Sequence, residues 1–146
     1  MQIRTKRCRQ ILTHDCAGQS TGFLLPIYNA NDPFFATCHQ PEQVYLTVVE
    51  VGKIKGPHLH MIRKGLFICI KGCVRFVLKV PSVGYHSIES GDGSESVLVE
   101  VPSGVALAIQ NIGKEDAYIL NMPAPAWTPS MNDEHTADFS DFDFTR

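Results

Sequence analysis

Short runs of β-branched and aromatic residues, each bounded by Gly, Pro, Ser or Asn-Asp, most constrain what this chain can fold into. The runs cover residues 44–51, 65–70, 73–78, 96–101, 105–111 and 117–122. No stretch between them keeps a helical apolar period over ten residues. Strands of this length and spacing are typical of an all-β sandwich or barrel. We expect a tight hairpin at Lys71-Gly72 and a loop over residues 89–96.

Length and charge narrow the class of protein. The 146 residues suffice for one domain with its own core. The net charge of −2, with scattered Lys and Arg, gives no electrostatic footprint for nucleic acid. The locally basic start, MQIRTKRCRQ, predicts an edge strand blocked by charges, with a phosphate-binding arm as the alternative. We find no signal-peptide core and no 18-residue apolar run for a membrane span.

The cysteines bear on the compartment. They number five, an odd count, and include no CxxC pair. This pattern favours reduced thiols in a cytoplasmic protein over a disulfide framework.

Two motifs resemble those of the cupin superfamily. In GKIKGPHLHMIRKGLFICIKG, residues 52–72, the glycines and the two histidines have the spacing of the first cupin motif. PSGVALAIQN, residues 102–111, matches the second motif through its Pro, Gly and Asn. The resemblance implies a jelly-roll barrel with its ligand site inside. We therefore expect one cupin domain over residues 1–146, with a barrel core at about 20–122 and an acidic-aromatic C-terminal segment at 123–146.

The departures from these motifs concern metal binding. A typical cupin metal is held by two histidines, here His58 and His60, with a glutamate where Gly65 stands and a histidine where Leu107 stands. Two imidazoles fall short of the three protein ligands typical of catalytic zinc. Cys69 has the parity to serve as a replacement ligand. We expect no metal and no cofactor, while a metalloenzyme with unusual ligands stays open.

A narrower resemblance is to enzymes that act on nucleotide sugars. KGPHLH followed by LFICIKGCVRFVLK is similar to a segment of nucleotide-sugar 3,4-ketoisomerases. Lys55, Gly56 and His58 align with the R-G-L-H segment of dTDP-4-dehydrorhamnose 3,5-epimerases, and residues 121–144 resemble the closing segment of this group. The resemblance implies a homodimer in sugar or polysaccharide biosynthesis, with N-terminal strands at the contact between the two copies.

Histidine suits the chemistry that this resemblance implies. The hydrogen beside the carbonyl of a 4-keto sugar is acidified, and an imidazole that titrates near about 6.5 can abstract it. We expect His58 to be the base, His60 to be the partner acid or an orienting group, and Tyr45 to lie near the sugar. The candidates for contacting the diphosphate or enolate charge are basic: Lys55, Arg63, Lys64 and Arg75.

Other functions stay open at this stage. Double epimerisation is the second choice, because Tyr118 has an unsuitable offset for the tyrosine acid of the epimerases. Asp138, Asp141 or Asp143 can supply a carboxylate to the histidine. A cupin that binds a sugar or nucleotide without turnover is compatible with the same sequence, as are histidines that only hydrogen-bond and pack.

Overall fold

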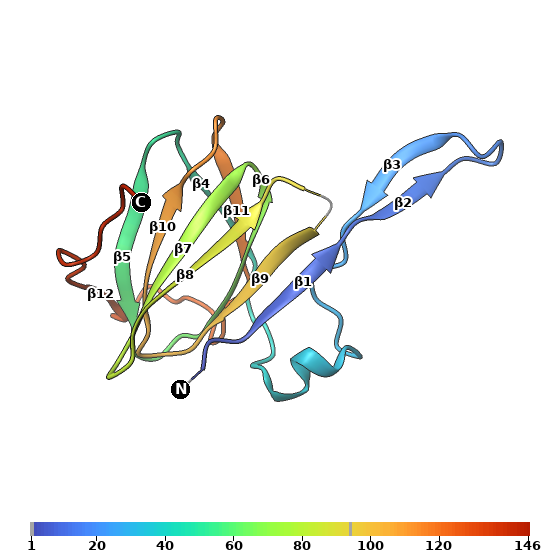
Figure 1. Ribbon diagram of the computed structural model, residues 1–146. Helices are drawn as coiled ribbons and strands as arrows, with labels where there is room; N and C mark the ends of the chain where they lie inside the picture. The colour runs from blue at the N-terminus through green and yellow to red at the C-terminus, as the bar shows by residue number, and fades with distance from the viewer. Residues whose placement is uncertain (1, 94) are drawn as a thin grey trace.

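Two five-stranded antiparallel sheets face each other and form a barrel in the computed structural model, which describes residues 2–93 and 95–146 (Figure 1). The first sheet has the order β1 (Thr5–Arg9), β9 (Glu95–Val101), β6 (Gly65–Lys71), β11 (Ala117–Asn121) and β4 (Tyr45–Val49). The second has the order β12 (Glu134–Thr136), β5 (Ile54–His60), β10 (Ala106–Asn111), β7 (Cys73–Val80) and β8 (Gly84–Gly91). The predicted all-β barrel is confirmed.

Alternation along the strands builds the core. On β7, Val74, Phe76 and Leu78 are fully buried between the two sheets, where they meet residues such as Val99 and Ile119. Successive side chains of a strand point to opposite faces, so the intervening residues of β7 lie on the outer face of the second sheet. These core side chains do not fill the whole barrel interior, and a cavity remains toward one end.

The predicted hairpin at Lys71-Gly72 is wrong. β6 and β7 follow each other directly, but β6 pairs with β9 and β11 while β7 pairs with β10 and β8. The chain therefore turns a corner from one sheet to the other. Gly72 has a φ of +79°, and a Cβ there would lie 3.1 Å from Ala117 Cα, which explains why the corner needs glycine. The expected loop at 89–96 is shorter than predicted, because β8 continues to Gly91 and β9 begins at Glu95.

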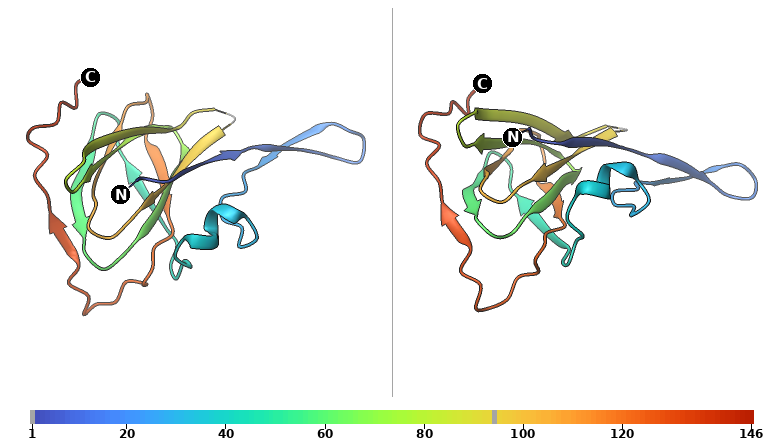
Figure 2. Two further views of the ribbon diagram at one scale, coloured as in Figure 1. Left: turned by 60° about the horizontal axis from the view of Figure 1, so that its bottom comes forward. Right: turned by 90° about the horizontal axis from the view of Figure 1, so that it is seen from below.

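The N-terminal region supplies one strand to the barrel and a separate hairpin. β1 is an edge strand of the barrel, and its charges pair with acids, for example Lys6 with Asp32 at 2.8 Å. β2 (Ile11–His14) and β3 (Ser20–Leu24) form a separate hairpin that projects away from the barrel (Figures 1 and 2). The edge-strand prediction for the basic segment is confirmed, and the next barrel strand after β1 is β4, which begins at Tyr45.

Segments outside the barrel cover its outer faces. The chain that follows β3 includes the 3-10 helix η1 (Pro33–Thr37), and its Phe35 packs against the first sheet. The C-terminal segment runs along the second sheet, on the opposite side from the hairpin, with Phe139, Phe142 and Phe144 packed over Val77 (Figure 2). Among the described residues, no helix is long and apolar enough to cross a membrane.

Candidate active site

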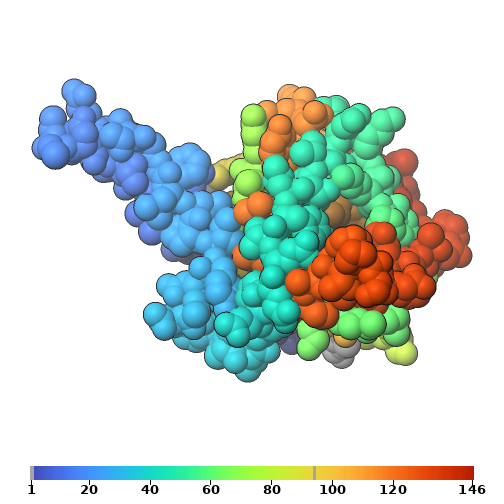
Figure 3. Space-filling model, turned by 180° about the vertical axis from the view of Figure 1, so that it is seen from behind, coloured from blue at the N-terminus to red at the C-terminus, as the bar shows by residue number. Residues whose placement is uncertain are grey.

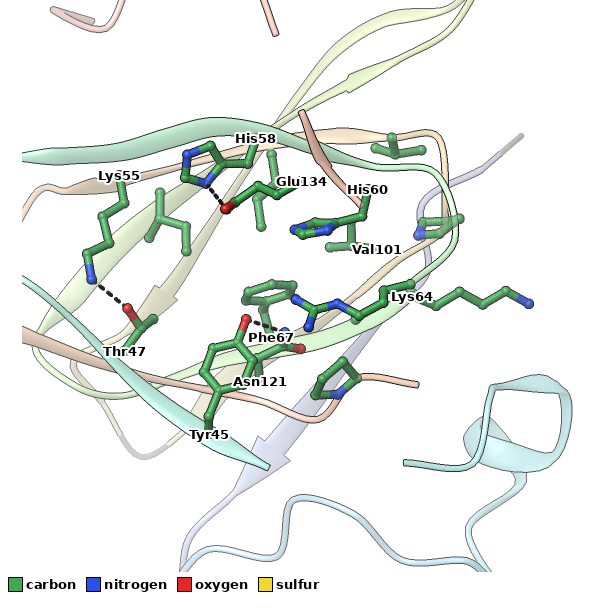
Figure 4. Close-up of a pocket in the computed structure, with 17 residues that line it drawn as sticks. Tyr45, Thr47, Lys55, His58, His60, Lys64, Phe67, Val101, Asn121 and Glu134 are labelled. Carbon is green, nitrogen blue, oxygen red and sulfur yellow. Dashed lines mark hydrogen bonds and ion pairs between the residues drawn. The ribbon is translucent and has the colours of Figure 1, made fainter. Parts of the chain in front are cut away.

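The cavity lies between the two sheets and has a volume of about 190 Å³ (Figure 4). It is bounded by β4, β5, β6, β9, β10 and β11, by the turn after β5, and by the first residue of β12. Its polar lining residues are Tyr45, Thr47, Lys55, His58, His60, Arg63, Lys64, Asn121 and Glu134. The barrel interior thus combines polar groups from segments that are far apart in sequence with an apolar lining that includes Phe67, Val101 and Leu107, and small-molecule sites combine these two kinds of lining.

A bulge in β5 directs Lys55 and His58 to the same cavity. Lys55 pairs with Ile109 and His58 pairs with Leu107. A separation of three residues on β5 therefore matches a separation of two residues on β10. The extra residue falls at Gly56-Pro57, and Gly56 has a φ of +84° with Leu107 O only 2.8 Å from where its Cβ would be. Because a bulge shifts the alternation by one residue, both side chains line the cavity.

His58 is paired with a carboxylate. Its Nδ1 lies 3.0 Å from Glu134 Oε1, and the side chains are 48% and 61% exposed (Figure 4). Antiparallel pairing of β12 with β5 places Glu134 opposite His60 and Thr136 opposite His58. A carboxylate at Nδ1 favours the tautomer in which Nε2 can accept a proton. The pair therefore has the form of a general base with an orienting acid residue.

His60 lies deeper and next to a different carboxylate. Its side chain is 28% exposed, and its Nδ1 is 3.6 Å from Asp133 Oδ2. Burial lowers the pKa of His60, the positive charge of Arg63 lowers it further, and Asp133 and Glu134 offset only part of this effect. The lowered pKa disfavours the protonated imidazolium form of His60.

Asp133 fixes the turn after β5. Its side chain is 3% exposed, and the backbone N–H groups of residues 61–63 donate to its two oxygens at 2.9–3.0 Å. Burial alone would raise the pKa of Asp133, but these three donors outweigh it and lower the pKa. The ionised carboxylate thus holds the turn that carries Arg63 into the cavity.

Tyr45 faces the histidines from the other sheet. Asn121 Nδ2 donates to Tyr45 Oη at 2.8 Å, while Asn121 Oδ1 accepts the N–H of Leu66 at 3.0 Å. Asn121 is 3% exposed, so its amide is fixed at both ends. Since the tyrosine oxygen already accepts a hydrogen bond, its own hydrogen is free to be donated into the cavity.

The four basic candidates divide by location. Lys55 and Arg63 line the cavity, and Lys55 Nζ donates to Thr47 Oγ1 at 2.7 Å. The backbone of Lys64 borders the cavity, but its side chain extends away from it (Figure 4). Arg75 does not line the cavity: it lies on the outer face of the second sheet, where it donates to Gln110 Oε1 and to the carbonyl of Arg146. Alternation along β7 explains the placement of Arg75.

The residues do not fit the usual metal set of this motif. A Cβ on Gly65 would lie 2.5 Å from Phe67 Cε2 and 3.0 Å from Asn121 Oδ1, so the place of a ligating glutamate is filled by these side chains. Leu107 lines the cavity with carbon alone. Cys69 does not line the cavity. Burial raises the pKa of its thiol to about 12, and the thiol donates to the carbonyl of Lys71. Within residues 2–93 and 95–146, no group of three or more His, Cys, Asp or Glu is arranged to hold a metal.

We expect the purified protein to carry below about one tenth of an equivalent of transition metal, because the two histidines have no third protein ligand. Elemental analysis after dialysis, with and without a chelator, measures this. Near-stoichiometric zinc, iron, nickel or manganese that survives dialysis would contradict the expectation.

The sequence did not predict three polar groups of the site, which are the carboxylates of Asp133 and Glu134 and the side-chain amide of Asn121. Asp138, Asp141 and Asp143 do not supply the histidine carboxylate. Asp141 accepts from Tyr85, while Asp138 and Asp143 cap local turns at Ser140 and Thr145. Asp133 and Glu134 lie next to the histidines instead. No sequence signal marked this placement, because β12 is only three exposed residues, Glu134–Thr136, that pair at the edge beside β5.

Comparisons with known proteins identify the fold. No known protein family matches the sequence, and no curated protein does either. The structure is similar to a dTDP sugar isomerase from Desulfovibrio desulfuricans, with a TM-score of 0.72, 18% identity, and coverage of 92% of this chain and 83% of that one. It is also similar to dTDP-4-dehydrorhamnose 3,5-epimerase from Sulfolobus tokodaii, with a TM-score of 0.74, 17% identity and coverage of 96% and 80%. Both are cupin-fold proteins. This chain has the cupin fold.

A third similar cupin was solved with a nucleotide. It is a sugar 3,4-ketoisomerase from Thermoanaerobacterium thermosaccharolyticum in complex with TDP, with a TM-score of 0.63, 21% identity, and coverage of 90% of this chain and 86% of that one. At sequence identities this low, the structural similarity establishes the shared fold and no more. What this cupin does must be argued from its own cavity.

Proposed function

We propose that this cupin is an isomerase that moves the ketone of a 4-keto nucleotide sugar by proton transfer through an enolate, without a metal. The observation that carries the proposal is the cavity in which the His58–Glu134 pair faces a tyrosine whose hydroxyl hydrogen is free. The similar structures, which are nucleotide-sugar isomerases and epimerases, support the same reaction class.

His58 is the proposed base. It takes the hydrogen from the sugar carbon beside the carbonyl, and the electron pair of that bond moves toward the carbonyl oxygen to form an enolate. Glu134 orients the imidazole and stabilises the imidazolium that results. The proton then returns at the former carbonyl carbon, while the neighbouring hydroxyl loses its hydrogen and becomes the new ketone. Atoms and electrons balance without an oxidant.

Tyr45 is the proposed acid at the carbonyl oxygen. Of the two candidates opposite or beside His58, His60 has its pKa lowered by burial and by Arg63, which disfavours its protonated form. Tyr45 keeps a free hydrogen because Asn121 donates to its oxygen. His60 then serves as a positioning residue. The guanidinium of Arg63 and the ammonium of Lys55 offset the negative charge of the enolate or the diphosphate.

Ketone migration is favoured over double epimerisation. The resemblance to the epimerases requires a tyrosine acid from the last barrel strand, and here that strand contributes Asn121 to the cavity. Tyr118 of the same strand is 36% exposed on the outer face, beside Lys71. The tyrosine in this cavity comes from β4, on the far side of Asn121.

Incubation with 4-keto sugars linked to dTDP, UDP and GDP in D₂O tests the proposal. Proton NMR should show exchange of the carbon-bound hydrogen and appearance of the 3-keto sugar. Stoichiometric binding without exchange for any of these compounds would assign the protein to the non-catalytic sugar- or nucleotide-binding class instead.

We also propose that the protein is a homodimer joined through the β2–β3 hairpin. Ile11, Leu12, Phe23 and Leu24 are 49–67% exposed on this hairpin. An isolated two-stranded hairpin is marginally stable in water, so a second copy is the natural cover for these side chains. Light scattering at micromolar concentration should give twice the mass of one chain, and Leu12→Ser with Phe23→Ser should reduce it to one. A wild-type mass of a single chain would contradict the proposal.

A further inference from the structure

Glu134, the carboxylate at His58, lies on a strand that contributes little to its own stability. β12 has three residues, all of them exposed, and it pairs with β5 at the edge of the second sheet. A short edge strand with exposed side chains buries little apolar surface and opens at a low cost in free energy. The place of the Glu134 carboxylate therefore depends on what fixes the chain before and after β12.

Two buried side chains bracket β12. Asp133 precedes the strand and accepts three N–H groups of the turn after β5. Phe139 follows the strand, and its side chain is 5% exposed. Among residues 131–146, these two are the buried ones. Figure 3 shows the segment before β12 in orange-red on the surface beside β4 and β5, and Figure 2 shows the segment after it, residues 137–146, along the second sheet.

The seat of Phe139 lies on the outer face of strands whose inner face bounds the cavity. The ring belongs to a cluster whose other fully buried members are Val77, Ala106 and Ala108. Val77 of β7 pairs with Ala108 of β10, and Leu107, between the two alanines, lines the cavity. Because successive residues of a strand face opposite sides, both alanines lie on the outer face, where their small side chains leave room for a ring.

Further contacts hold residues 137–146 on this face. Lys79 Nζ donates to the carbonyl of Asp138 at 2.9 Å. The ring of Tyr85 lies 5.2 Å from that of Phe139, and its hydroxyl donates to Asp141. Two residues, 137 and 138, separate Phe139 from the end of β12. So short a link cannot take up a displacement of the ring, so the strand must follow it.

We infer that Phe139 is a positioning residue that acts through Glu134: its seat on the outer face keeps β12 paired with β5 and thereby keeps the carboxylate at His58. This inference rests on the proposed function, because it gives residues 137–146 a part in the proton transfer. Phe139 does not line the cavity, so its loss should slow the chemical step and leave the KM for the substrate unchanged.

A double-mutant cycle tests the coupling. Phe139→Ala should lower kcat for hydrogen exchange of a 4-keto nucleotide sugar about tenfold at unchanged KM, and Phe139→Leu should restore most of this loss. In a protein that already carries Glu134→Gln, Phe139→Ala should lower kcat less than about twofold, because the carboxylate that it positions is gone. Amide hydrogen exchange should become faster in residues 134–136 of Phe139→Ala, and this readout needs no substrate.

Phe35→Ala is the matched control. Phe35 is 6% exposed and packs on the outer face of the first sheet, away from β12. Its loss should lower the urea midpoint about as much as Phe139→Ala does, yet leave kcat and the amide exchange of residues 134–136 at the wild-type values. Circular dichroism checks that each variant is folded. If Phe139→Ala does not fold, Phe139→Leu carries the same comparisons with a smaller expected loss.

The outcomes separate this inference from the proposed function. An equal loss of kcat from Phe139→Ala with and without Glu134→Gln would overturn the inference and leave the isomerase standing. Wild-type amide exchange in residues 134–136 of Phe139→Ala would do the same. A wild type that exchanges no sugar hydrogen would overturn the proposed function and, with it, the catalytic part assigned to Phe139.

Discussion

His58→Asn is expected to reduce turnover of a 4-keto nucleotide sugar about 100-fold or more, because that is the scale of losing a general base. Asn has a similar size and keeps hydrogen-bonding groups, so the barrel should remain folded. The rate of hydrogen exchange in D₂O, followed by NMR, measures the effect. His60→Asn should cost less, since we assign His60, beside Asp133 and with a lowered pKa, a positioning role.

A matched control is available on β8. His86 lies on the second sheet and does not line the cavity, so His86→Asn should exchange hydrogen at the wild-type rate. Unchanged exchange in His58→Asn would remove this residue from the mechanism. Equal losses in the His58 and His60 variants would instead show that His60 also transfers a proton.

Asp133→Ala should lower the free energy of unfolding by about 3 kcal/mol, because it leaves three partly buried N–H groups without their charged acceptor. Asp133→Asn should cost less, since its remaining oxygen can keep the N–H groups of residues 61 and 62. Its amide group would then meet the N–H of Arg63, a donor against a donor. Urea unfolding measures both variants, and Asp138→Ala, at an exposed turn, serves as the control with a small effect.

Acidification gives an independent check on Asp133. Its pKa is lowered in the folded protein, so the stabilisation is fully present above the ordinary carboxyl pKa and is lost as the pH falls through the folded value. The stability gap between the wild type and Asp133→Asn should therefore be largest near neutral pH and shrink in acid. A gap that stays constant down to strongly acidic pH would show that the charge of Asp133 is not what holds the turn.

Strand identity was predictable because it depends on local pattern, whereas sheet membership was not. The apolar runs of β6 and β7 are separated only by Lys71 and Gly72, as in a hairpin, yet the chain changes sheets at Gly72. Neither run contains a sequence signal that indicates which strand it will pair with. Alternation predicted that His58 and His60 share a face, and the resemblance to the ketoisomerases implied that Tyr45 lies near them; all three residues line the cavity.

The carboxylates were not predictable in the same way. Asp133 and Glu134 reach the histidines because the chain after β11 crosses the cavity and adds β12 to the edge beside β5. Such a crossing leaves no periodicity in the sequence. Arg75 failed as a substrate contact for the opposite reason: β7 is regular, and its parity sends Arg75 outward with Lys79.

The bulge at Gly56-Pro57 places one extra residue in β5 and so shifts by one residue the positions that face the cavity. Upstream of it Lys55 faces the cavity, and downstream His58 and His60 do so, although a regular strand would allow only one of these sets. Removing Gly56 would restore regular alternation and leave Lys55 two residues before His58, still on the cavity side, whereas a strand that kept Gly56 without the bulge would turn Lys55 to the outside. A cation three residues before the first histidine, with glycine next to it, is therefore a pattern by which relatives of this site can be recognised in sequences too divergent to align.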